Sequence, residues 1–311
     1  SRRRCGATMS EVAIGLVGLA ALLFLFMTGI ELGFAMAIVG FVGFGTIVSW
    51  GAATNLLAKD IYDVFASYGF TVIPLFVLMG QVAYNAGIAK RLFNTSYKFI
   101  GHIPGGLALA TVAGATVFKA ICGSSPATAA TFASVAVPEM DRYGYDKRLS
   151  TGAVASVGTL GILIPPSVTL IVFGIITEQS IGRLFLGGIV PGLIIAAMFA
   201  LTIVVWCRID PALGPKGARS SWKERLASMP EVVWVLLVFV VIIGGLMKGF
   251  FTPTEAGSVG TFAVILLSLA QRGLSLRGFA KSLAEALRTA CMVMMLIAGS
   301  TVLGHILATP I

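Results

Sequence analysis

The stretch FKAICGSSPATAATF, residues 118–132, places a polar, helix-breaking cluster in the middle of a long apolar region. The arms on either side of GSSP hold about 14 to 18 residues each, or about 21 to 27 Å of helix at 1.5 Å per residue. That is shorter than the hydrocarbon core of a bilayer, which is about 30 Å thick. Non-helical backbone is tolerated at membrane depth only where it lines a cavity or is buried in protein. We therefore expect residues 105–140 to form a re-entrant hairpin with GSSP at its tip.

The composition of the whole chain is that of a membrane protein. Of its 311 residues, 57% are hydrophobic and only 11% are charged, whereas soluble domains carry about 25% charged residues. The 37 glycines suit close helix packing in lipid. The net charge of +9 does not indicate a nucleic-acid partner, because the basic residues form short clusters between apolar runs, as cytoplasmic loops do.

Apolar runs of about 20 residues predict the membrane spans. The basic start followed by an apolar run imitates a signal peptide, but no small-residue cleavage site follows, so we expect a retained first span that begins after Met9. The expected spans are residues 11–30, 32–50, 70–89, 184–207, 231–249, 255–271 and 289–308. Amphipathic helices at the membrane surface are expected at residues 52–68, 90–100 and 275–288.

The order of these elements predicts an inverted repeat. The order span, span, amphipathic helix, span occurs from 11 to 89 and again from 231 to 308, and LAKDIYDVF at 57–65 matches FAKSLAEAL at 279–287 in pattern. Basic clusters place the two copies in opposite orientations, which is typical of secondary transporters. The segments expected to be cytoplasmic are 90–104, 141–149, 208–225 and 272–288.

The repeat also predicts how the chain is divided. Its second hairpin would lie beyond residue 311, so we expect the chain to be C-terminally incomplete. The expected parts are flanking residues 1–8, scaffold spans and interfacial arm helices of the first repeat at 9–104, a transport-domain hairpin and broken helix at 105–180, a span with a basic linker at 181–230, and the first half of the second repeat at 231–311.

The segment GTLGILIPPS, residues 158–167, predicts a broken helix within 149–177. Pro165 and Pro166 donate no backbone hydrogen bond, so the carbonyls of Gly161 and Ile162 lose their helical partners. Free carbonyls in a dry setting are costly, and a dehydrated cation such as Na⁺ would satisfy them. The alternative is a proline-kinked helix whose carbonyls are bonded by neighbouring Ser or Thr side chains.

The tip of the hairpin supplies groups that suit an anion as well. Pro126 fits the first turn of the returning arm, whose N-terminus carries about half a positive charge that favours a carboxylate. Packing through small residues is the alternative, and it explains the alanines better than the Ser-Ser-Pro break. For Lys119, a functional role and a snorkelling or paired charge both remain open.

Neither a metal centre nor an enzyme is expected. Cys5, Cys122, Cys207 and Cys291 have no paired spacing, and His102 and His305 lack partners at ligand spacing, so we expect no cofactor and no metal beyond Na⁺. An intramembrane hydrolase using Ser124 or Ser125 would need a base within hydrogen-bond reach, and neither histidine is well placed.

The segments CGSSPATAATFASVAVPEM and GYDKRLSTGAVASVGTLGILIPPSVTLIVFGIITEQSIGRLFLGGIVPGL resemble the large, DctM-like membrane subunit of TRAP (tripartite ATP-independent periplasmic) transporters. The resemblance implies an elevator-type secondary transporter in the bacterial inner membrane that works with a small DctQ-like membrane subunit and a periplasmic DctP-like binding protein. It implies Na⁺-driven import of organic acids, such as C4-dicarboxylates or sialic acid. A stand-alone sodium/dicarboxylate symporter is the alternative.

Residues and resemblance together give two sets of candidate site residues. The predicted Na⁺-binding residues are Gly123, Ser124, Ser125, Gly158, Thr159, Gly161, Ile162, Pro165 and Pro166. The predicted substrate-facing residues are Ser124, Ser125, Pro126, Thr128 and Ser167.

Overall fold

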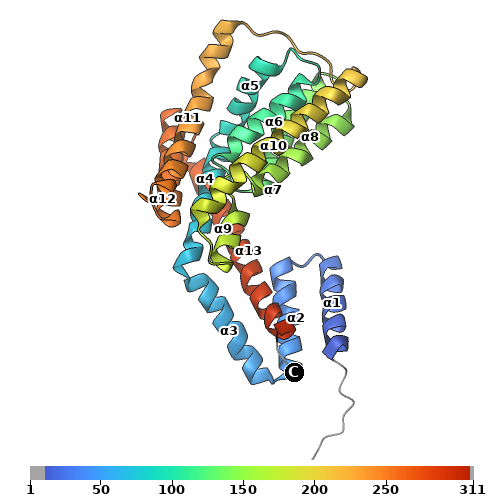
Figure 1. Cartoon of the computed structure of the whole chain (residues 1–311), viewed down its shortest axis with the longest axis vertical. Helices are drawn as coiled ribbons and strands as arrows, with labels where there is room; N and C mark the ends of the chain where they lie inside the picture. The colour runs from blue at the N-terminus through green and yellow to red at the C-terminus, as the bar shows by residue number, and fades with distance from the viewer. Residues whose placement is uncertain (1–10, 309–311) are drawn as a thin grey trace, which may run out of the picture. The chain divides into compact units, whose positions relative to one another are not determined.

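A computed structural model describes residues 11–308 of the chain, with side chains for residues 15–307. In that range every regular element is a helix, as expected (Figure 1). The helices are α1 Glu11–Met27, α2 Leu32–Ile47, α3 Trp50–Ala66, η1 Tyr68–Thr71, α4 Val72–Asn85, α5 Ile88–Ile100, α6 Gly106–Lys119, α7 Ser125–Arg142, α8 Lys147–Thr159, η2 Leu160–Ile162, α9 Val168–Ile176, α10 Ile181–Ile209, α11 Trp222–Met247, α12 Pro253–Ala270 and α13 Leu276–Ala308.

Among the described residues, four helices are long and apolar enough to cross a membrane. They are α10, α11, α12 and α13. If α3 and α4 are taken together as one broken span, they count as a fifth. This agrees with a multi-pass membrane protein.

The described chain forms two compact units, which are considered separately. The first contains the chain up to Phe70 and from Arg288 onward, and the second runs from Thr71 to Leu287. The division into scaffold and transport parts that the sequence suggests stays a prediction.

The first unit packs through glycine. A Cβ atom added at Gly33 of α2 would lie 2.8 Å from backbone atoms of Met295 in α13. One added at Gly40 would lie 2.9 Å from the backbone nitrogen of Leu303. Only glycine at these α2 positions allows the two helix backbones to approach so closely, as small residues do between membrane helices.

The second unit is built around α6. Helices α5, α7, α8 and α10 all pack on it (Figure 1), and most of its residues are buried. Apart from two threonines and Lys119 at its end, its sequence GLALATVAGATVFK is apolar on every side, as expected of a helix surrounded by protein. Helices α4, α11 and α12 pack beside this group, with α12 on α4 and α11 on both α12 and α5.

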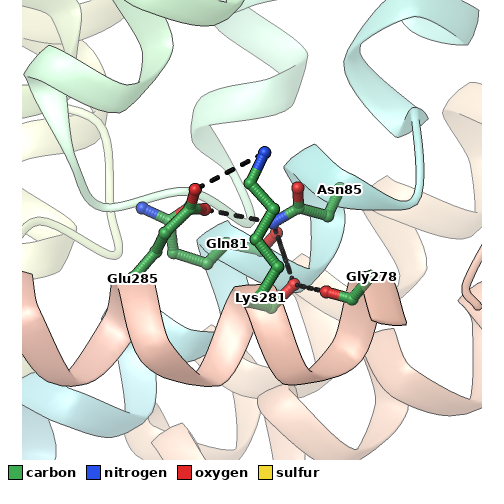
Figure 2. Close-up of polar contacts among 6 residues, drawn as sticks. Gln81, Asn85, Gly278, Lys281 and Glu285 are labelled. Atoms are coloured by element: carbon green, nitrogen blue, oxygen red, sulfur yellow. Dashed lines mark hydrogen bonds and ion pairs between the residues drawn. The ribbon is translucent and has the colours of Figure 1, made fainter. Parts of the chain in front are cut away.

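Two polar networks tie the helices of the second unit together. Arg91 of α5 bonds Glu231 of α11 at 3.1 Å and Gln271, at the end of α12, at 2.6 Å. Figure 2 shows the other, in which the Asn85 amide nitrogen donates to Ser282 at 3.0 Å and to Glu285 at 3.2 Å. This second network fixes the end of α4 against the first turns of α13.

Three predicted boundaries are wrong. Residues 275–288 and 289–308 form one helix, α13, because neither glycine nor proline interrupts the chain between Phe279 and Ala298. The span expected at 70–89 is represented by the 14-residue α4, which ends before Gly87, a residue with φ of +74°. Helix α11 starts at Trp222, earlier than expected, because Ser221 and Glu224 form a capping box.

Candidate functional site

The predicted helical hairpin is present. Helix α6 ends at Lys119, the chain turns through residues 120–124, and α7 starts at Ser125. The Ser124 hydroxyl accepts a 3.3 Å hydrogen bond from the backbone N–H of Ala127 and so caps α7. Phe118 and Phe132 pack edge to face across the hairpin, with ring centroids 6.0 Å apart. Entry of this hairpin into a membrane from one side stays a prediction.

The predicted broken helix is also present. Helix α8 ends at Thr159, a short 3₁₀ turn covers Leu160–Ile162, and α9 starts at Val168 after the two prolines. The Ser167 hydroxyl accepts from the backbone N–H of Leu170 at 3.4 Å, so Ser167 caps α9.

One detail of the break corrects the sequence-based expectation. The Ser167 hydroxyl donates a 2.8 Å hydrogen bond to the carbonyl oxygen of Ile162, so that carbonyl is not left without a partner. The alternative in which a neighbouring serine satisfies the break therefore holds at this carbonyl. A carbonyl oxygen has two lone pairs, so the bond does not by itself decide whether Ile162 is an ion ligand.

The tip of the hairpin and the break of the helix lie against each other. A Cβ added at Gly123 would lie 2.5 Å from the carbonyl oxygen of Pro166, and one added at Gly158 would lie 3.2 Å from Ala129 of α7. The backbone N–H of Val168 donates to the Gly123 carbonyl at 3.4 Å. The fold thus brings together the two motifs that the sequence analysis selected separately.

Lys119 lies at this junction. Its side chain has no exposed area, and its ammonium nitrogen donates a 3.0 Å hydrogen bond to the Ser124 carbonyl. A Cβ added at Gly161 would contact the Lys119 ammonium and lie 2.7 Å from the Ser125 hydroxyl oxygen. The lysine therefore lies between the tip and the break.

The predicted substrate-facing residues fall into two groups. Ser124 and Ser125 are half-buried and Pro126 is exposed. Thr128 and Ser167 have no exposed area. The Thr128 hydroxyl donates to the Ser124 carbonyl at 3.0 Å. In this structure only the first three residues offer surface to a ligand, because the hydroxyls of the other two are used inside the protein.

Sequence reasoning missed the contribution of α10. A Cβ added at Gly188 would contact the carbonyl oxygen of Leu163, and one added at Gly192 would lie 2.6 Å from Ile164. These glycines let α10 approach the break closely. They lie in LFLGGIVPG, and two glycines four residues apart were the sequence signal that could have predicted this close helix packing.

A family model described as the tripartite ATP-independent periplasmic transporter, DctM component, matches residues 19–310. The chain belongs to the DctM family. Members of this family are large permease subunits of TRAP transporters and not enzymes.

Several curated DctM-family proteins are similar to the chain. The C4-dicarboxylate TRAP transporter large permease protein DctM of Pseudomonas aeruginosa is 38% identical over 254 residues, which cover 81% of this chain and 59% of that protein. The sialic acid TRAP transporter large permease protein SiaM of Vibrio cholerae is 31% identical, over 91% of this chain and 66% of its own length. The isethionate TRAP transporter permease protein DctMQ of Oleidesulfovibrio alaskensis is 33% identical, over 98% of this chain and 51% of its own length. The chain thus spans about half to two-thirds of these DctM-family relatives.

Among the side chains that the structure describes, those of residues 15–307, no group of three or more His, Cys, Asp or Glu could hold a metal ion. His305 has a carboxylate neighbour that the sequence did not reveal, since its Nε2 lies 3.3 Å from Asp60. The three described cysteines, Cys122, Cys207 and Cys291, form no disulfide.

Proposed function

We propose that this DctM-family chain is part of the membrane permease of a tripartite, Na⁺-coupled secondary transporter. It imports an organic acid, such as a C4-dicarboxylate, a sialic acid or a similar carboxylate, delivered by a periplasmic binding protein. The observation that carries this proposal is the packing of the GSSP tip against the GTLGILIPPS break, with glycine at Gly123 and Gly161 where the two meet.

The junction has the chemistry that an organic anion requires. The N-terminus of α7 presents Ser124 and Ser125 with partly exposed side chains, and a helix N-terminus favours negative charge. The buried ammonium of Lys119 adds a positive charge behind the tip. A substrate carboxylate at the exposed side of Ser124, Ser125 and Pro126 would meet both.

The same junction offers oxygen ligands for the coupling ion. Na⁺ is bound by hydroxyl and backbone carbonyl oxygens, which unwound helix segments in transporters supply. We propose that these oxygens come from the tip, with Ser124 and Ser125, and from the break, with the backbone of Gly158, Thr159, Gly161 and Ile162. Pro165 and Pro166 keep the backbone unwound there.

The architecture proposed for this function is an inverted repeat that works as an elevator in the bacterial inner membrane. Two features of the sequence support this architecture. The order of elements is repeated, and the basic clusters indicate that the two copies cross the membrane in opposite orientations. A small membrane subunit and a soluble binding protein complete the proposed assembly. The words "tripartite" and "periplasmic" in the description of the matching family support these partners.

Transport in proteoliposomes tests the proposal. The assembled transporter that contains this chain is reconstituted, and uptake of labelled C4-dicarboxylate and sialic acid is measured with and without an inward Na⁺ gradient and with and without the binding protein. Uptake that requires both supports the proposal, whereas uptake indifferent to Na⁺ overturns the coupling. Uptake that ignores the binding protein supports the stand-alone symporter instead.

A further inference from the structure

Lys119 brings a positive charge into the place where the coupling ion is proposed to bind. It is the last residue of α6, and its ammonium donates to the Ser124 carbonyl at 3.0 Å. The ammonium also contacts the face of Gly161 that a Cβ would occupy. It therefore touches both the hairpin tip and the break, as a bound cation at the junction would.

The sequence left two structural explanations of this lysine open, snorkelling and pairing with a carboxylate, and the structure fits neither. Snorkelling would carry the ammonium to a surface, but the side chain has no exposed area. Pairing would require a carboxylate. Among residues 15–307, whose side chains the structure describes, the carboxylates in ion pairs are those of Glu231, Glu285 and Asp60, none of them with Lys119. A buried charge without such a partner, in a hairpin expected to lie within the membrane, indicates a functional role.

The ammonium already uses an oxygen on which Na⁺ would depend. The Ser124 carbonyl accepts from the Lys119 ammonium at 3.0 Å, from the Thr128 backbone N–H at 3.1 Å and from the Thr128 hydroxyl at 3.0 Å. A carbonyl oxygen has two lone pairs, so little capacity remains for another cation. Two like charges at contact distance also repel each other strongly in a poorly solvated site.

We propose that the Lys119 ammonium and Na⁺ are alternative occupants of the cation site between the GSSP tip and the break. This inference rests on the proposed function, because it concerns the same ion site. Lys119 acts as a tethered competitor that lowers the affinity of the site for Na⁺. Sodium binds there only when the lysine side chain withdraws from the Ser124 carbonyl.

Removal of the charge should strengthen Na⁺ binding. The test uses the full chain in lipid nanodiscs and measures thermal unfolding while NaCl replaces choline chloride at constant ionic strength. An ion that binds the folded state raises the unfolding temperature with a midpoint set by its Kd. Lys119→Met should lower the Na⁺ midpoint by at least about tenfold, because the like charge is gone. Lys147→Met, which removes the same charge from an exposed position in α8, should leave the midpoint unchanged.

The outcomes separate this inference from the proposed function. Equal Na⁺ midpoints in the wild type and in Lys119→Met, or a higher midpoint in the variant, overturn the competition while leaving the Na⁺ site in place. Stabilisation of Lys119→Met alone supports the competition and overturns Na⁺ coupling at this site in the wild type. No response in either protein overturns both. Lys119→Gln, which keeps a donor for the Ser124 carbonyl but carries no charge, provides the same comparison if the methionine variant does not fold.

Discussion

The Ser167 hydroxyl donates a 2.8 Å hydrogen bond to the Ile162 carbonyl across the break between α8 and α9. The Ser167 hydroxyl oxygen also accepts a hydrogen bond from the Leu170 backbone N–H at 3.4 Å. One side chain therefore closes the end of the 3₁₀ turn and caps the helix that follows. This arrangement links the 3₁₀ turn to the start of α9 through a single side chain.

Replacement of this serine should loosen the break. Ser167→Ala leaves the Ile162 carbonyl without its donor and α9 without its cap, and each loss typically costs about 1–2 kcal/mol. We expect the free energy of unfolding in mixed micelles to fall by about 1–3 kcal/mol. Ser156→Ala, which removes a hydroxyl that bonds only within α8, should change it by less than about 0.5 kcal/mol. Equal effects of the two substitutions would contradict the role given to Ser167.

Gly161 should tolerate no larger side chain. In Gly161→Ala the new methyl group would collide with the Lys119 side chain and the Ser125 hydroxyl, so we expect a loss of about 1–3 kcal/mol and reduced substrate uptake. Gly152→Ala in α8 is the matched control, because a Cβ there meets no atom within 4 Å. That substitution should stabilise the helix by about 0.5–1 kcal/mol. Normal stability and uptake in Gly161→Ala would show that the tip and the break do not pack as described.

The first unit allows the same comparison. A Cβ added at Gly299 of α13 would contact the Gly33 carbonyl of α2, whereas one added at Gly304 meets no atom within 4 Å. Gly299→Ala should therefore lower the unfolding temperature and Gly304→Ala should not, with a difference of about 1–3 kcal/mol between the two variants. Denaturation of the purified variants in the same detergent measures this difference. A greater loss in Gly304→Ala would contradict the packing of α2 on α13.

Tyr145 should make stability depend on alkaline pH. It lies in the turn between α7 and α8, where its hydroxyl donates to the Pro215 carbonyl at 2.8 Å and accepts from the Leu107 backbone N–H at 3.1 Å. Burial raises the pKa of Tyr145 to about 12, from the value of about 10 that we expect in the unfolded chain. The folded state thus keeps the proton longer, and this contribution to stability is complete below pH 10 and is lost as the pH rises toward 12.

Tyr145→Phe checks that contribution. At pH 7 the variant should be less stable than the wild type by about 1–3 kcal/mol, because the buried Leu107 N–H and the Pro215 carbonyl both lose their partner. The difference should shrink between pH 10 and 12, since only the wild type loses the interaction there. Tyr62→Phe, at a position that is 70% exposed, should match the wild type at pH 7. A stability difference that stays constant up to pH 12 would contradict the account of Tyr145.

The sequence predicted the two breaks well because their causes are local. Gly123, Ser124 and Pro126 interrupt a helix wherever they stand together, and Pro165 with Pro166 removes two backbone donors regardless of tertiary context. Both breaks are present in the structure at the expected positions.

Other features depended on tertiary contacts and could not be predicted in this way. The sequence left the role of Lys119 open because only the fold places its ammonium beside Gly161. The donor to the Ile162 carbonyl is five residues further along the chain, and its reach depends on the conformation of the break. The roles of Gly188 and Gly192 required the position of α10.

In the proposed function, the half-buried side chains of Ser124 and Ser125 at the hairpin tip bind the transported acid and its coupling ion. The most direct test is Na⁺-driven uptake of a labelled organic acid by the assembled transporter that carries Ser124→Ala and Ser125→Ala together. Ser134→Ala, at an exposed position of the same helix α7, is the control. We predict that the double variant loses at least about 90% of uptake at unchanged expression, because a loss of about 1.4 kcal/mol of binding free energy already lowers affinity tenfold. The control should transport normally. Equal uptake by the double variant and the control would show that the tip is only a structural turn and that the binding site lies elsewhere.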